Sequence, residues 1–321
     1  MASSGTKSLV LAGASTVGRG TPWGTLCEVV TKALTPLGYE CVIETRSYGM
    51  QNGRYVADGR ADLGAWLMTH VIDAYHGVRV FAPEGPRDNL RVIAHINHPA
   101  WIAAAVRAES GITDLADIVR NKIPARIRTG GSQVIAMIWE HYGITKELLE
   151  SWGGSMEGAH EGEGDAASAP IAEPELVDWV VEGNFDVILD SIYTGAAPEI
   201  PHWAQATDRY ELNFLPMPEA LIERICSTGL ASRGFVPHRL MRGIWSDIPS
   251  IQRLPHAIYC RSETPDQLAT DVTRALDENR QFFRQCHLAY SYDSANVALD
   301  LGVPLHPAAA SYYRSVGIPT T

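Results

Sequence analysis

The chain has 321 residues, of which 45% are hydrophobic and 20% are charged, and its formal net charge is −11. This length predicts two domains of about 150 residues each. The acidic balance argues against nucleic acid as the main partner, because phosphate binding needs clustered Lys and Arg, but it leaves room for a local pocket that binds a small anion.

The first half of the chain predicts an α/β unit. The apolar run at 7–13 indicates a buried strand, small polar residues follow it, and Pro22 is placed to start a helix. A second strand is predicted at 40–45, and the segment 52–67 reads as a short helix, a turn and a third strand. The order strand, loop, helix, strand, helix, strand predicts a largely parallel sheet.

The rest of the chain, from residue 89 on, repeats this alternation. Strands are predicted at 89–98, 101–109, 123–129 and 184–191, helices at 111–121, 133–143, 175–183 and 264–286, and further ordered segments at 211–216, 218–225 and 256–262. The stretch 153–174 holds five acidic residues without Lys or Arg, so we expect an exposed, mobile loop there.

Two loops of small residues precede predicted helices. Ser15 and Thr16 come before the helix that starts near Pro22, where backbone N–H groups favour a carboxylate or phosphate and Arg19 can add a bidentate contact. The segment "GRGTPWG" has the spacing G-x-G-x-x-x-G, so it is not a dinucleotide-binding motif. The segment "RTGGS" at 128–132 repeats the arrangement. The alternative for both loops is helix capping alone.

Other candidates follow predicted strand ends, where ligands bind open α/β sheets. Thr69 and His70 follow the third strand, and Asp190 and Tyr193 lie at and just past the end of the strand at 184–191. The predicted ligand-binding residues are Ser15, Thr16, Arg19, Trp23, Thr69, His70, Thr129, Gly131, Ser132, Asp190 and Tyr193. Ser132 lacks the G-x-S-x-G context of a nucleophile, so we expect a hydrogen-bond donor or cap there.

No metal or cofactor site is predicted. The five cysteines contain no C-x-x-C pair, which predicts buried free thiols. The metal candidates have no H-E-x-x-H or other compact ligand spacing. They are His95, His98 and the group His160, Glu161, Glu163 and Asp165.

Six segments, in order along residues 7 to 318, resemble the TAXI-type solute-binding proteins of tripartite (TRAP) transporters. They are "LAGASTVGRGTPWG", "YGMQNGRYVADGRADLGAWLMTHVIDAYHG", "VRAESGITDLADI", "RTGGSQVIAMIWEHYG", "GNFDVILDSIYTGAAPE" and "PLHPAAASYYRSVG". The resemblance implies a type II periplasmic-binding-protein fold, with two Rossmann-like lobes, a hinge and a central ligand cleft. Lobe 1 would comprise residues 1–99 plus 206–321, and lobe 2 residues 100–205. The tail at 301–318 would pack onto lobe 1, with a structural His306.

The function implied is binding of a small organic acid, a carboxylate or an amino acid, as the substrate-binding component of a TRAP-type transporter. The implied partner is a membrane transporter subunit, without direct membrane insertion or nucleic-acid binding, since no run approaches about 20 apolar residues. Location would be periplasmic or otherwise extracytoplasmic. The start "MASSGTKSLVLAGAS" lacks the features of a secretory leader, so a cytoplasmic protein is the alternative if no leader was removed.

A leaderless enzyme on the same fold is the second hypothesis. It would be a lyase, a decarboxylase or dehydratase acting on a carboxylated substrate, and it would use His70, His95 and His98. Binding without chemistry is preferred, because no nucleophile or metal motif is recognisable in the chain.

Overall fold

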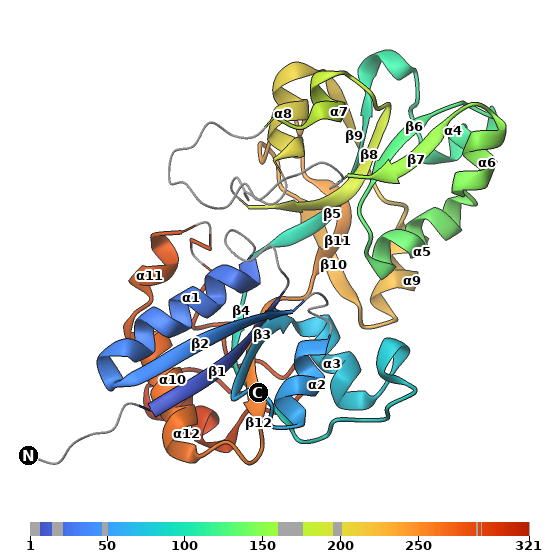
Figure 1. Cartoon of the computed structure of the whole chain (residues 1–321). Helices are drawn as coiled ribbons and strands as arrows, with labels where there is room; N and C mark the ends of the chain where they lie inside the picture. The colour runs from blue at the N-terminus through green and yellow to red at the C-terminus, as the bar shows by residue number, and fades with distance from the viewer. Residues whose placement is uncertain are drawn as a thin grey trace, which may run out of the picture. The chain divides into compact units, whose positions relative to one another are not determined.

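The computed structural model of the chain describes residues 7–14, 22–46, 51–159, 176–194, 201–286, 288–289 and 291–320. The chain divides into two compact units. Unit 1 comprises residues 1–98 and 254–321, and unit 2 comprises residues 99–253. Figure 1 shows each unit as a sheet with helices on both faces.

Unit 1 is built on a sheet in the order β2-β1-β3-β12-β4. Its strands are β1 (Lys7–Ala14), β2 (Tyr39–Arg46), β3 (Leu63–Leu67), β4 (Leu90–Ile96) and β12 (His256–Arg261). Its helices are α1 (Pro22–Leu34), α2 (Asn52–Ala57), α3 (Met68–His76), α10 (Asp266–Glu278), α11 (Gln281–Arg284) and α12 (Pro307–Ser315). β1 pairs in parallel with β2 and β3, whereas β12 runs antiparallel between β3 and β4.

Unit 2 repeats this pattern in the order β10-β11-β5-β8-β6-β7, with β9 also paired to β5. Its strands are β5 (Ala100–Arg107), β6 (Arg126–Thr129), β7 (Ser155–Gly158), β8 (Val187–Tyr193), β9 (Leu212–Leu215), β10 (Ala231–Val236) and β11 (Ile248–Arg253). Its helices are α4 (Leu115–Arg120), α5 (Gln133–Tyr142), α6 (Lys146–Ser151), α7 (Asp178–Val181), α8 (His202–Arg209) and α9 (Glu219–Cys226).

The two sheets share one topological feature. In each unit, the first strand after the chain enters from the other unit lies antiparallel beside the parallel strands: β5 pairs with β8, and β12 with β3. The predicted fold class is confirmed in that the chain forms two α/β units, each built on its own mixed sheet.

Alternating burial along the strands builds a core on each sheet face. In β1, Leu9 and Leu11 pack under α1 and α10, while Ala12 belongs to the layer under α2 and α3. In unit 2, one layer lies under α4, α5 and α9 and the other under α7 and α8. Each fully buried large aliphatic side chain contributes about 1.5–3 kcal/mol of transfer free energy.

The C-terminal tail packs onto unit 1, as predicted. α12 lies against α10 (Figure 1), and the Tyr313 hydroxyl donates a hydrogen bond of 3.0 Å to the Ile93 carbonyl in β4. His306 caps α12, because its Nδ1 accepts from the Ala308 N–H while its Nε2 lies 3.0 Å from the Thr264 carbonyl oxygen. The role of His306 within the described structure is therefore structural.

Several segments differ from the sequence-based expectation. The return to unit 1 lies at 253/254 instead of 205/206, because β9 and β11 pair with β5 and β10 pairs with β11. The predicted loop at 153–174 contains β7, which is held by parallel pairing with β6. The predicted helix at 264–286 is interrupted after Glu278, and a separate short helix begins at Gln281.

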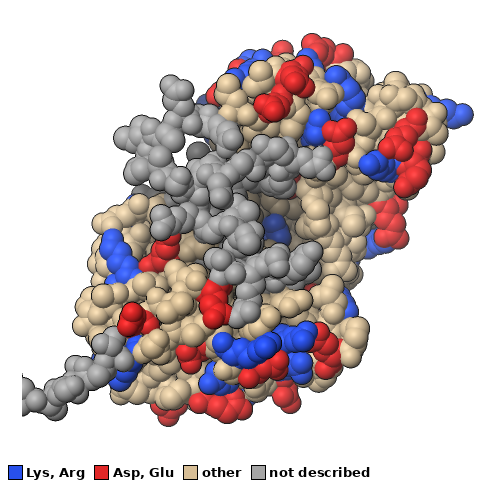
Figure 2. Space-filling model, in the orientation of Figure 1, with Lys and Arg blue, Asp and Glu red and all other residues tan. Residues whose placement is uncertain are grey.

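Charged side chains of both signs are interspersed over the described atoms of the face in Figure 2. Ion pairs in unit 2 include Arg126 with Asp186 at 2.7 Å and Arg224 with Glu140 at 2.9 Å. Among the described atoms that Figure 2 shows, basic side chains form no continuous track for a phosphate backbone.

Candidate functional site

The carboxyl ends of β6 and β8 lie at one edge of the unit 2 sheet. Thr129 ends β6 and pairs with Leu189, so residues 190–193 of β8 extend beyond β6. β5 begins at the same edge, because Ala100 pairs with Tyr193. Ligands of α/β sheets bind at such edges. This edge carries several of the predicted ligand residues.

The loop after β6 is held by hydroxyl groups. Thr129 Oγ1 accepts a hydrogen bond of 2.9 Å from Trp139 Nε1 and donates to the Gly130 carbonyl at 3.2 Å. Ser132 is the N-cap of α5, where its Oγ accepts from the Ile135 N–H at 3.3 Å. Ser132 therefore has the capping role that the sequence left open as the alternative, and this cap does not use its O–H donor.

Asp190 lies beneath this loop. It is 3% exposed, and its carboxylate accepts a hydrogen bond of 2.6 Å from the Ser191 N–H. Its other oxygen lies 3.4 Å from Nε2 of His202, a fully buried residue at the start of α8. Because it is enclosed, Asp190 shapes the loop from below. His202 was missed, since α8 was not predicted.

Arg253 is a further candidate at the same edge. It ends β11 next to Gln252, which pairs with Trp101 near the start of β5. The half-buried guanidinium donates a hydrogen bond of 2.9 Å to Ser191 Oγ. Among the described residues, no carboxylate forms an ion pair with Arg253. It is therefore a fixed cation with spare donors for an anion.

In unit 1, the described residues include only part of the predicted site. Outside them are Ser15, Thr16, Arg19 and the side chain of Trp23. The fully buried Asn52, at the start of α2, donates from Nδ2 to the Gly13 carbonyl at 2.9 Å, near the end of β1. Its Oδ1 has no hydrogen-bond partner among the described residues. Asn52 therefore fixes the strand end that leads into the first predicted loop.

Thr69 and His70 occupy the first turn of α3, directly after β3 ends at Leu67. Both are half-buried, and the His70 ring lies 6.2 Å from the ring of Trp66. Their position at a strand end is as predicted, and their contact with a ligand stays a prediction.

The three histidines of the enzyme hypothesis occupy separate environments. His95 is buried, its Nε2 lies 3.0 Å from the Leu299 carbonyl, and burial lowers its pKa to about 4. Its ring is therefore neutral at pH 7. His98 is also buried, with Nδ1 3.4 Å from Ser291 Oγ and its ring 6.3 Å from that of His256.

Within the described ranges, no cluster of three or more His, Cys, Asp or Glu has the geometry to hold a metal ion. The four metal candidates at 160–165 lie outside those ranges. A search of the described helices for one long and apolar enough to cross a membrane found none.

The chain belongs to the NMT1-like family, whose model matches residues 11–174 and 181–317. This match includes all the described residues at the unit 2 edge.

Solved structures that are similar to this chain include three ligand-bound proteins. Lactococcal OpuAC with glycine betaine is 11% identical, with a TM-score of 0.43, and the match covers 87% of this chain and 98% of that one. Tv2483 bound to L-arginine is 12% identical, with a TM-score of 0.40 and coverage of 89% and 93%. A substrate-binding protein of an ABC uptake transporter from Streptococcus pneumoniae, with bound histidine, is 10% identical, with a TM-score of 0.40 and coverage of 89% and 93%.

Proposed function

We propose that this chain binds a small organic acid, a carboxylate or an amino acid, without chemically changing it. The observation that carries this proposal is Arg253. A guanidinium with spare donors, held in place by Ser191, suits a carboxylate, which accepts two parallel N–H bonds in one plane.

The loop before α5 adds support. Gly131 is exposed, and nothing lies within 4 Å of where its Cβ would be, so a ligand atom has room to approach the backbone. The N-terminus of this ten-residue helix carries partial positive charge. Ser132 keeps an O–H donor beside it. The helix N-terminus and the Ser132 hydroxyl both favour a ligand with an acidic group over one with an ammonium or a neutral group.

The test is ligand-observed proton NMR with a panel of small mono- and dicarboxylates and amino acids, recorded over several hours. Selective broadening of one compound whose peaks stay intact is expected. The variant Arg253→Gln should weaken its binding at least tenfold, because a charge-assisted hydrogen bond contributes about 1.5–3 kcal/mol. The matched control is Arg120→Gln, an exposed arginine on α4 in the same unit. Equal ligand affinity in Arg253→Gln and Arg120→Gln would contradict a role for Arg253 in binding the ligand.

We further propose that the chain serves as the substrate-binding component of a TRAP-type transporter and works outside the cytoplasmic membrane. The ordered motifs in the sequence support the transporter class. Uptake of the identified ligand by membranes that contain TRAP-type subunits, only when this protein is added, is the expected result. Uptake with ABC-type subunits instead would reassign the transporter.

The same NMR series tests the lyase alternative. His95 is buried in the core of unit 1, so one of the three catalytic groups that the lyase hypothesis proposes cannot contact a substrate. Product peaks that grow with time would overturn the binding proposal. His70 and His98 would then be the candidate catalytic groups.

A further inference from the structure

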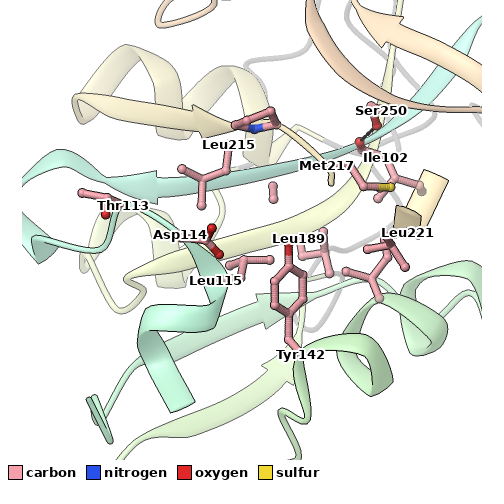
Figure 3. Close-up of a pocket in the computed structure, with 13 residues that line it drawn as sticks. Ile102, Thr113, Asp114, Leu115, Tyr142, Leu189, Leu215, Met217, Leu221 and Ser250 are labelled. Carbon is pink, nitrogen blue, oxygen red and sulfur yellow. Dashed lines mark hydrogen bonds between the residues drawn. The ribbon is translucent and has the colours of Figure 1, made fainter. Parts of the chain in front are cut away.

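Unit 2 contains a cavity on the sheet face covered by α4, α5 and α9. Its volume is about 70 Å³. Strands β5, β8 and β9 form its floor through apolar side chains, and the start of α4, the end of α5 and the link into α9 form its walls (Figure 3). Its lining includes Ala104, Asp114, Tyr142, Leu189, Leu215 and Met217.

Two polar groups mark one side of this cavity. In Figure 3 the Tyr142 hydroxyl points into the space beside Leu189, and the Asp114 carboxylate lies across from it. The Tyr142 hydroxyl makes no hydrogen bond within the described structure. Burial, together with the charge of Asp114, raises the pKa of Tyr142 to about 12, so the phenol stays protonated.

The side chains that line the cavity carry charge of one sign only, which is negative. Asp114 is the charged residue among the lining side chains, and the lining includes no Lys, Arg or His. The exposed Asp114 carboxylate is the N-cap of α4, where it accepts from the Ala116 N–H at 2.8 Å and from the backbone N–H of Asp117. A carboxylate has about four lone-pair sites, so it can accept a further bond from a ligand. A monovalent cation with N–H donors complements this lining.

The volume of the cavity limits the size of the ligand that it can hold. An apolar cavity of about 150 Å³ holds benzene, so this cavity suits an apolar stem of roughly three carbons. We propose that it is a binding site for a short-chain primary alkylammonium, with the stem against Leu189 and Leu215 and the ammonium between Asp114 and Tyr142. The site is independent of the proposed organic-acid function.

Three ligands of similar size differ in the charge of their head group, so they test how that charge affects binding. They are propylammonium chloride, 1-propanol and sodium propionate. Each is titrated into protein labelled at the methyl groups of Leu, Ile and Met, and methyl NMR shifts are followed. Propylammonium should shift the signals of Leu189, Leu215 and Met217, with a dissociation constant in the high-micromolar to millimolar range. It should bind about fivefold more tightly than 1-propanol, with propionate weakest at these methyls.

Variants then separate the parts of the site. Ala104→Leu fills the floor and should abolish the shifts for all three ligands. Asp114→Asn keeps an N-cap residue and should remove the preference for propylammonium over 1-propanol. Tyr142→Phe keeps the shape and should weaken propylammonium. The proposal is overturned if 1-propanol or propionate binds as tightly as propylammonium, if Asp114→Asn keeps the preference, or if the shifts persist in Ala104→Leu.

Discussion

Gly130 lies against the carboxylate of Asp190 so closely that a Cβ at this position would clash with Asp190 Oδ1. The loop after β6 therefore rests directly on a buried acid, and its path depends on a residue without a side chain. Asp190 is held in turn by the Ser191 N–H. The main chain of this loop and the carboxylate below it cannot move independently.

We expect Gly130→Ala to destabilise the protein by about 1–3 kcal/mol, since overpacking of an enclosed site displaces neighbouring atoms. It should also weaken ligand binding at the unit 2 edge, because the loop must shift away from Asp190. Urea denaturation and the carboxylate titration measure these two effects. Gly131→Ala is the matched control for stability alone, with open space around its Cβ, and should change stability by less than about 0.5 kcal/mol. Similar losses of stability in both variants would contradict this interpretation.

Much of unit 1 and the first half of unit 2 could be predicted from the sequence. Apolar runs such as 7–13 and 101–109 become buried strands, and Asp114 and Ser132 cap helices as their residue types suggest. These patterns depend on neighbouring residues in the sequence, so they can be recognised without knowledge of the tertiary contacts.

The missed elements depend on long-range pairing. β10 and β11 contain "ASRGFV" and "IPSIQR", in which polar residues and Pro interrupt the apolar pattern. Their position is fixed by the antiparallel pairing of β10 with β11 and by the contact of β11 with β5, far away in the sequence. Because Arg253 reaches the site edge only through β11, sequence reasoning missed it as well.

β7 shows a similar dependence. The segment "SMEG" lies in an acidic, glycine-rich stretch with weak strand propensity. Parallel pairing with β6 makes it a strand, and Glu157 forms an ion pair of 2.6 Å with the buried Arg128. An acidic residue that suggested a mobile loop thus neutralises a buried cation.

Stability should depend on pH through His95. Burial lowers its pKa from 6.5 to about 4, so between these values the unfolded chain binds a proton that the folded chain does not. The free energy of unfolding should therefore fall as the pH drops through this window, by roughly 3 kcal/mol in total for this group. Urea denaturation at several pH values from 4 to 7 measures the slope. The lowered pKa of the buried His306 acts in the same direction, because burial disfavours its charged form.

The variant His95→Gln isolates this contribution, because Gln does not titrate and can still donate to the Leu299 carbonyl. We expect a shallower loss of stability toward low pH in this variant. His141→Gln, at an exposed position on α5, should retain the wild-type slope. A wild-type slope in His95→Gln would mean that other groups carry the pH dependence.

The tail should stabilise unit 1 through Tyr313, whose ring is fully buried and whose hydroxyl donates to the Ile93 carbonyl. Tyr313→Phe keeps the packing and removes this hydrogen bond, so we expect a loss of about 1–1.5 kcal/mol. Tyr75→Phe is the control, since the Tyr75 hydroxyl makes no hydrogen bond within the described structure. Urea denaturation compares the two variants. Equal stability of Tyr313→Phe and wild type would mean that this hydrogen bond does not contribute to the stability of unit 1.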